Sequence, residues 1–113
     1  MLYIDFEADR KAYKLRLTTR DVITLEKRLG CNPVMIFGNG DRMPTITEMV
    51  AILHASLQTY HHGITFDAAL DIFDAWLMDG HIPTDFLNII VKIYQVSGLA
   101  ERAKGEAEES EKN

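Results

Sequence analysis

The spacing of the apolar residues changes once along this chain, from every second position to every third or fourth. This change restricts the fold more than any other feature. Residues 2–7 and 13–17 alternate apolar and polar, which puts the apolar side chains of each run on one face of a strand. The polar residues 8–11 separate the two runs, so the pattern predicts a β-hairpin. The side chains expected on its apolar face are Leu2, Ile4, Phe6, Tyr13, Leu15 and Leu17.

From residue 18 onward the apolar residues recur at helical spacing, and each run is bounded by capping signals. The expected helix starts are Thr18 or Thr19, the capping box Thr45-Ile46-Thr47-Glu48, Thr65 and Pro83-Thr84-Asp85. The expected stops are Gly30, Gly63, Gly80 and Gly98. Asn32-Pro33 predicts a further short turn. We therefore expect a mainly α protein, a small bundle of about four helices with an N-terminal β-hairpin. A lone hairpin is marginal in water, so the helices must cover it.

The last predicted helix, which starts after Pro83, has the widest apolar arc. It is either the central helix of the bundle or a helix that a partner covers, and the sequence leaves both readings open. After Gly98 the composition changes, and from Gly105 onward no large apolar residue occurs. We expect residues 1–98 to form a single α-rich domain and residues 99–113 to be an acidic, disordered tail.

The charge distribution and the cysteine content limit which partners and which cellular compartment are expected. Residues 1–42 contain eight Lys/Arg and six Asp/Glu and carry +2, whereas residues 43–113 contain four and eleven and carry −7. This acidic balance argues against a nucleic-acid partner. No apolar stretch approaches the length of a membrane span, and the acidic N-terminus is unlike a signal peptide. The lone Cys31 suits a reducing compartment, so we expect a cytoplasmic protein.

No catalytic, metal or cofactor site is expected. His54 and His61 are seven residues apart, too distant along a helix for one ion, and the adjacent His61 and His62 point about 100° apart. Three aspartates fall on the polar side of the helix predicted after Thr65, where solvation is the ordinary role of carboxylates. They are Asp67, Asp71 and Asp74.

Surplus apolar and soft side chains predict a protein partner. Trp76 is hard to bury whole in so small a domain, and Met78 lies off the main apolar stripe of its helix. Tyr94 belongs to the wide apolar arc of the last helix. Trp76, Met78 and Tyr94 are therefore the candidate partner-binding residues, and ordinary core packing is the competing interpretation.

Residues 13–33, YKLRLTTRDVITLEKRLGCNP, combine a strand, Leu-Thr-Thr, a helix containing Leu-Glu, then Leu-Gly and Asn-Pro. This order resembles the tail assembly chaperones of long-tailed bacteriophages and prophages of Gram-positive bacteria. Residues 46–57, followed by a Gly-Ile-Thr break and an acidic helix, fit the same outline. The similarity covers roughly residues 13–98 and is a pattern of helix starts and apolar positions, without a sharp motif from which binding residues could be transferred.

The resemblance implies a non-enzymatic protein that binds the tape-measure protein and keeps it soluble in the cytosol of the bacterial host while the tail is assembled. The alternative is a tail or connector structural subunit that stays in the virion. A third interpretation, a small regulatory protein of a mobile element, would require specific DNA or repressor binding. Homo-oligomerisation is left open by the sequence, and so is the binding face.

Overall fold

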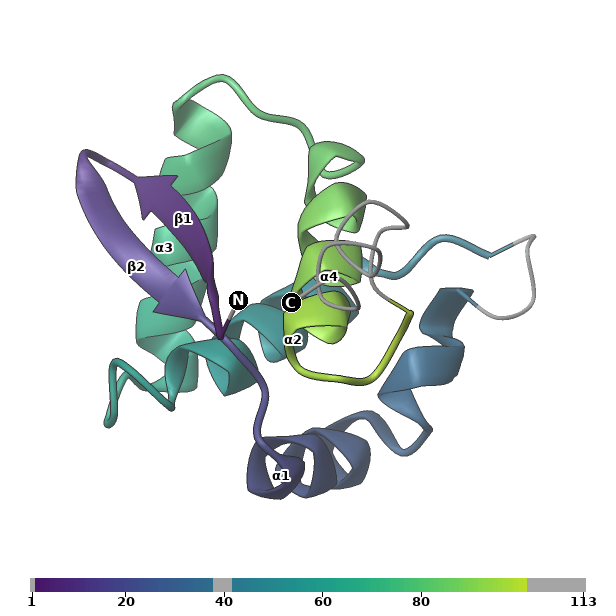
Figure 1. Cartoon of the computed structure of the whole chain (residues 1–113). Helices are drawn as coiled ribbons and strands as arrows, with labels where there is room; N and C mark the ends of the chain where they lie inside the picture. The colour runs from purple at the N-terminus through teal and green to yellow at the C-terminus, as the bar shows by residue number, and fades with distance from the viewer. Residues whose placement is uncertain (1, 38–41, 102–113) are drawn as a thin grey trace, which may run out of the picture.

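The computed structural model describes residues 2–37 and 42–101. In that part of the chain four α-helices follow an N-terminal β-hairpin, which confirms the predicted fold class (Figure 1). The elements are β1 (Ile4–Ala8), β2 (Lys11–Leu15), α1 (Thr19–Leu29), the 3-10 helix η1 (Pro33–Phe37), α2 (Ile46–Leu57), α3 (Phe66–Met78) and α4 (Asp85–Val96). None of these helices is long and apolar enough to cross a membrane. The predicted loop at 38–41 lies outside the described residues.

The hairpin is tighter than the sequence pattern indicates. Its antiparallel strands pair Ile4 with Leu15 and Ala8 with Lys11, so only Asp9 and Arg10 form the turn. Both turn residues have positive φ, 51° and 64°. A two-residue turn with positive φ at both positions matches the right-handed twist of the flanking strands. The four residues 8–11, predicted as the connection, therefore include one residue of each strand.

One face of the hairpin is buried, as its alternation predicts. Ile4, Phe6 and Leu15 point into the core. Leu2 was expected on the same face, but β1 begins only at Ile4 and the Leu2 side chain is 66 % exposed. This expectation was wrong because the pairing ends before the alternating pattern does.

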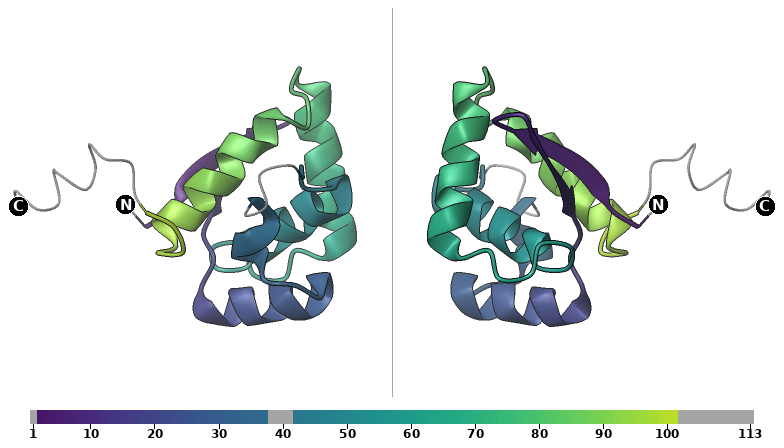
Figure 2. Two further views of the ribbon diagram at one scale, coloured as in Figure 1. Left: turned by 90° about the vertical axis from the view of Figure 1, so that its right-hand side faces the viewer. Right: turned by 90° about the vertical axis from the view of Figure 1, so that its left-hand side faces the viewer.

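The buried face of the hairpin packs on α3 and α4, while its second strand approaches α2 (Figures 1 and 2). Two backbone N–H groups fix the hairpin at separate points. Asp9 N–H donates to Oδ2 of Asp79, just beyond α3, at 2.8 Å. Lys14 N–H donates to Nε2 of His61, between α2 and α3, at 2.9 Å. The helices thus provide the cover that two strands require.

Three helix starts follow the predicted capping signals, whereas Thr84 precedes α4 without a side-chain cap bond. Thr18 and Thr45 each form a capping box, with Asp21 and Glu48 respectively, and the Thr65 hydroxyl accepts the third cap bond. These side chains satisfy backbone N–H groups that have no partner within the helix. α2 was predicted to stop near Gly63, but it ends at Leu57. The chain reaches Gly63 through turns.

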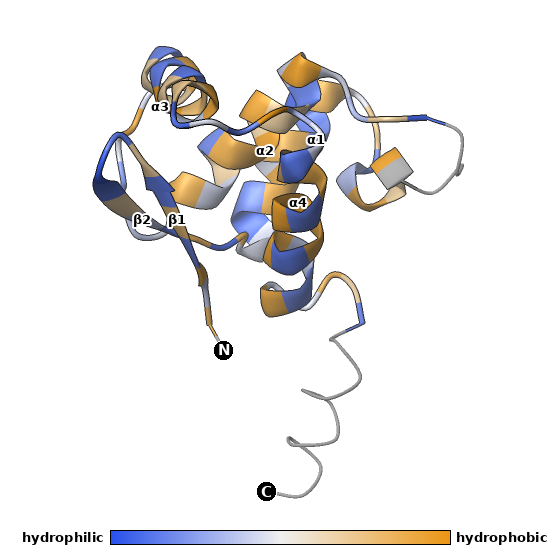
Figure 3. Ribbon diagram, turned by 90° about the horizontal axis from the view of Figure 1, so that it is seen from above, coloured by the Kyte–Doolittle hydropathy of each residue, from blue (hydrophilic) through white to orange (hydrophobic). Residues whose placement is uncertain are grey.

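The central helix is α2, because most of its side chains are buried between the other helices and the hairpin (Figure 3). Ile46 at the start of α2 and Tyr60 just beyond its end are 47 % and 39 % exposed. α4 packs against α2 and β1 on one side and leaves Val91 exposed. The last helix, α4, is therefore not the central helix of the bundle, because α2 has that position.

The ordered chain continues beyond Gly98. Leu99 packs against the core, and its N–H donates to the Tyr94 carbonyl at 2.8 Å. Leu99 was predicted to lie in the tail, so the packed region extends past the expected boundary. Residues 102–113 of the predicted tail lie outside the described residues.

Candidate partner-binding surface

The structure separates the three predicted partner-binding residues. Trp76 and Tyr94 are each only 3 % exposed, so they belong to the core and are not available to a partner, whereas Met78 is 82 % exposed. The Trp76 ring is covered by His81, which stacks on it at 4.5 Å between centroids and 5° between planes. The Tyr94 hydroxyl donates to the Pro33 carbonyl at 2.8 Å. Other parts of this chain cover both rings, so core packing, the competing interpretation, holds for Trp76 and Tyr94.

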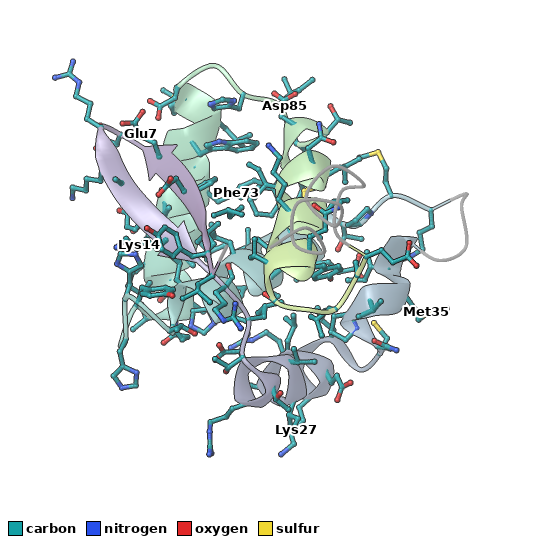
Figure 4. The ribbon with its side chains drawn as sticks, in the orientation of Figure 1. Glu7, Lys14, Lys27, Met35, Phe73 and Asp85 are labelled. Carbon is teal, nitrogen blue, oxygen red and sulfur yellow. The ribbon has the colours of Figure 1, made fainter. Side chains whose placement is uncertain are left out.

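Met78 belongs to a group of methionines on the outside of the molecule. Met35 is 55 % exposed and Met43 is 49 % exposed, whereas Met49 is fully buried in α2. Figure 4 shows Met35 on η1, at the edge of the molecule. Methionine is polarizable and unbranched, so it adapts to irregular apolar surfaces and is over-used where proteins bind varied partners. Other large apolar side chains that are exposed are Leu2, Ile23, Ile46, Tyr60, Leu70, Ile82 and Val91.

An open groove of about 440 Å³ runs between α1 and α2. At its bottom lie Leu25 from α1 and the small Ala51 and Ala55 from α2, which are themselves buried, at 1 %, 1 % and 6 % exposed. Because the two alanines are four residues apart, they lie one above the other on one face of the helix and leave room beside α1. The polar rim consists of Thr18, Arg20, Asp21, Thr24, Arg28, His54, Gln58, Thr59 and His62.

Contacts at both ends fix the walls of this groove. At the start of α1, the Thr59 hydroxyl donates to Oδ2 of Asp21 at 3.1 Å. At the other end, the Arg28 guanidinium lies 4.3 Å from the ring centroid of Phe66. The His54 ring contacts the same Phe66 edge to face, at 5.6 Å between centroids. The groove is therefore held in shape by contacts that join α1, α2 and α3.

The groove has an excess of positive charge. Asp21 is its one carboxylate, and Oδ2 of this side chain already accepts bonds from Thr18 N–H and Thr59. Burial, and next the nearby Arg28 cation, lower the pKa of His54, so this imidazole is neutral at pH 7. Arg20 and Arg28 form no ion pair within the described residues and are exposed. The two guanidiniums are thus available to an anionic group.

A second hollow, of about 450 Å³, lies where the hairpin meets the end of α3. Its lining includes the stacked Trp76 and His81, three carboxylates (Asp5, Glu7 and Asp79) and one cation (Arg10). Asp79 is engaged through its bond from Asp9 N–H. This hollow is therefore acidic, opposite in charge to the groove between α1 and α2.

The histidines serve separate local contacts. His54 packs on Phe66, His61 accepts the Lys14 N–H, and His81 stacks on Trp76. In residues 2–37 and 42–101, no group of three or more His, Cys, Asp or Glu side chains could hold a metal ion. The three aspartates of α3, Asp67, Asp71 and Asp74, are exposed, which confirms the predicted polar side of this helix.

The groove was missed in the sequence, although part of its signal is present. Ala51 and Ala55 stand four apart in α2, on the side away from Met49 and Leu53, and small residues at this spacing leave a shallow strip on a helix. Arg28 falls in the last turn of its helix, where a basic residue is ordinary, so its type alone gives no signal of a groove. The missing information was that α1 lies beside the strip, which only tertiary packing determines.

The chain belongs to a family of unknown function, DUF6096, whose model matches residues 7–113. No curated protein and no solved structure matches the chain. The family match covers the hairpin from Glu7 onward and all four helices.

Proposed function

We propose that this protein is a non-enzymatic tail assembly chaperone of a bacteriophage or prophage, which binds the tape-measure protein in the host cytosol and keeps it soluble. The resemblance of residues 13–33 to that group of chaperones motivates the proposal. The structural observation that carries it is the exposure of Met35, Met43 and Met78 on a well-packed helical domain. Flexible apolar side chains of this kind suit a long helical client whose ridges vary along its length.

The charge distribution supports the same role. Asp67, Asp71 and Asp74 form an acidic outer face on α3, close in sequence to the exposed Leu70 and Met78. Carboxylates around apolar contact points would keep a complex with an insoluble client in solution. The two hollows of the surface differ in charge and are open, a shape suited to protein segments.

Co-expression with a tape-measure protein from the same genome tests the proposal. We expect that protein to be insoluble when expressed alone and to become soluble and co-purify with this chain. A variant with Met35, Met43 and Met78 all changed to Gln should lose most of this effect, because Gln keeps the length of the side chain but not its apolar surface. Lys27→Gln is the matched control, since Lys27 points away from the body of the molecule (Figure 4).

A client that stays insoluble while this chain forms a defined ring would support a tail or connector subunit instead. Mass spectrometry of purified virions separates the two roles, because a chaperone should be absent from the finished particle and a structural subunit present.

A further inference from the structure

We propose that the outer edge of β1 binds an extended, basic segment of a partner protein, which adds to the hairpin as a third strand. Residues of this edge, Asp5 and Glu7, line the acidic hollow at the end of α3. The inference does not depend on the tail assembly role, because it concerns backbone groups and a strand, not exposed methionines and a helical client. Its grounds are the backbone groups of β1 that have no partner and the charge beside them.

The hydrogen bonds of the hairpin show which backbone groups of β1 point outward. Opposite residues of an antiparallel pair alternate between pairs that exchange backbone hydrogen bonds and pairs that do not. Lys14 N–H leaves the hairpin to reach Nε2 of His61, so Lys14 and its partner Asp5 form a pair of the second kind. The next such pair toward the turn is Glu7 with Ala12. The N–H and C=O groups of Asp5 and Glu7 therefore point away from β2.

The two edges of the hairpin differ in how far the rest of the chain covers them. Along β2 and just beyond it, the outward N–H groups of Lys14 and Arg16 donate to acceptors in and just after α2. Along β1, the outward backbone groups of Asp5 and Glu7 have no hydrogen-bond partner among residues 2–37 and 42–101. Unpaired N–H and C=O groups of an edge strand are a template on which an extended peptide can add. β1 is therefore the edge at which a third strand can form.

The hollow of about 450 Å³ provides room beside this edge. Its lining runs from Asp5 and Glu7 on β1 to Asp79 beyond α3 and Ile89 on α4. The three carboxylate residues are exposed and Ile89 is half-buried, so each of them has open surface. β1 is the strand of the hairpin nearer to α4 (Figure 1). An added strand would thus lie between β1 and the start of α4.

The charge of the hollow selects a basic segment. Three carboxylates, those of Asp5, Glu7 and Asp79, stand against one cation, Arg10. None of these four side chains forms an ion pair within the part of the chain that the structure describes. Residues of an added strand that stand opposite Asp5 and Glu7 lie on the same face as these carboxylates, and opposite charges at such positions stabilise strand pairing. Lys or Arg at alternate positions is therefore the expected pattern of the ligand.

The same charges argue against a second copy of this chain as the occupant. If β1 paired with β1 of another copy in antiparallel orientation, the carboxylates of Asp5 and Glu7 would stand opposite those of the copy. Like charges directly opposite each other destabilise a strand pair. A basic segment of another protein replaces this repulsion with attraction.

Two synthetic peptides of about seven residues, enough for one strand, serve as probes. One has three Lys residues alternating with Val, and the other has Glu in place of each Lys. In the full-length isotope-labelled chain, saturating Lys peptide should slow amide hydrogen exchange at Asp5 and Glu7 by about fivefold or more, because these N–H groups gain acceptors. The Glu peptide should leave both exchange rates unchanged.

A methyl group on the peptide backbone distinguishes strand addition from simple ion pairing. Lys residues of the peptide that stand opposite Asp5 and Glu7 direct their N–H groups to β1, whereas the N–H groups of the Val residues point away. A peptide N-methylated at the central Lys should bind about tenfold more weakly, since it loses a donor to β1. N-methylation of a Val beside it is the matched control and should preserve binding. Equal binding of the two methylated peptides would contradict strand addition.

Proline variants of the hairpin make the same comparison on the protein. Glu7→Pro removes an outward N–H of β1, and Ala12→Pro removes the corresponding outward N–H of β2, so neither change breaks the bonds between the strands. Glu7→Pro should weaken binding of the Lys peptide about tenfold, and Ala12→Pro should bind like the unmodified chain. Glu7→Gln keeps the backbone and should weaken binding roughly two- to fivefold. Thermal unfolding verifies that each variant is folded, and the methylated peptides keep the test decisive if Glu7→Pro is not.

Three results would overturn the inference. Unprotected amides at Asp5 and Glu7 with saturating Lys peptide would mean that their carboxylates only guard the edge against pairing. Equal binding of the Lys and Glu peptides would remove the charge selection. Dimerisation of the chain that Glu7→Pro abolishes would assign the edge to a second copy.

The inference and the proposed function can fail separately. If the Lys peptide protects the amides of Asp5 and Glu7 but the tape-measure protein does not co-purify, the edge stands and the tail assembly role is wrong. If the tape-measure protein co-purifies while these amides stay unprotected by the peptide, the role stands and the inference about the edge is wrong.

Discussion

The imidazole of His61 accepts a hydrogen bond from the backbone N–H of Lys14 across 2.9 Å, and so joins the turn after α2 to the second strand of the hairpin. The ring of Tyr13 packs edge to face on the same imidazole, at 5.2 Å between centroids. Because Nε2 acts as the acceptor, this contact requires the neutral imidazole. Protonation would place a hydrogen between the two nitrogens and break the bond.

The stability of the protein should therefore fall on acidification. Burial lowers the pKa of His61, as does the Lys14 cation, and burial also lowers the pKa of His54. An unfolded histidine titrates near 6.5, so just below that pH the unfolded chain binds more protons than the folded one. The stabilisation is present above about pH 6.5 and is lost as the pH falls. Urea denaturation at pH 7.5 and 5.5 should show a lower midpoint at pH 5.5.

His61→Phe tests the origin of this pH dependence. The variant should lose roughly 0.5–1 kcal/mol at pH 7.5, because the Lys14 N–H loses its acceptor. Its further loss between pH 7.5 and 5.5 should be smaller than that of the unmodified protein. His62→Gln removes the adjacent, exposed imidazole and should preserve the full pH dependence. An unchanged pH dependence in His61→Phe would assign the effect to other groups.

Tyr94→Phe should destabilise the protein by about 1–2 kcal/mol, because it removes the one hydrogen bond of the buried hydroxyl and leaves the Pro33 carbonyl without that donor. This bond joins α4 to the start of η1. Tyr60→Phe is the matched control: Tyr60 is 39 % exposed, and the same change there should stay within about 0.5 kcal/mol of zero. Urea denaturation measures both. Similar losses at the two sites would contradict a specific role for the Tyr94 hydroxyl.

Thr45→Ala should cost about 1 kcal/mol, since the Thr45 hydroxyl accepts the Glu48 N–H at the start of the central helix α2. Thr47→Ala makes the same chemical change two residues later, at an exposed helical position without a capping role, and should be neutral or slightly stabilising. Thermal unfolding of the two variants side by side provides the comparison. If Thr47→Ala is the more harmful change, the capping box is not what stabilises this end of α2.

Arg10→Gly should stabilise the protein by about 0.5 kcal/mol. Arg10 has φ 64° in the hairpin turn, a conformation that is unfavourable for a residue with Cβ and easy for glycine. The gain is reduced because glycine has more freedom in the unfolded chain. Lys11→Gly, one residue further on in extended β2, should instead lose roughly 0.5–1 kcal/mol. A loss of stability in Arg10→Gly would mean that the arginine side chain stabilises the turn.

The sequence by itself determined which kind of element forms at each place. Local signals act over a few neighbouring residues, so they can be recognised in the sequence before the fold is known. Examples are the capping boxes at Thr18 and Thr45 and the alternating apolar residues of β1. The same local signals were less accurate at the ends of elements. The exposure of Leu2 and the end of α2 at Leu57 both depend on where tertiary contacts stop.

Only the tertiary structure decided which side chains face solvent and which elements lie side by side. Trp76 looked too large to bury, yet His81 and Phe6 from other parts of the chain lie against its ring. The groove needs Arg28 on α1 beside Ala51 and Ala55 on α2, residues more than twenty positions apart. Periodicity within one helix identifies an apolar side but not the neighbour that covers it. That neighbour is set by the packing of all the elements together, which minimises exposed apolar surface over the whole chain.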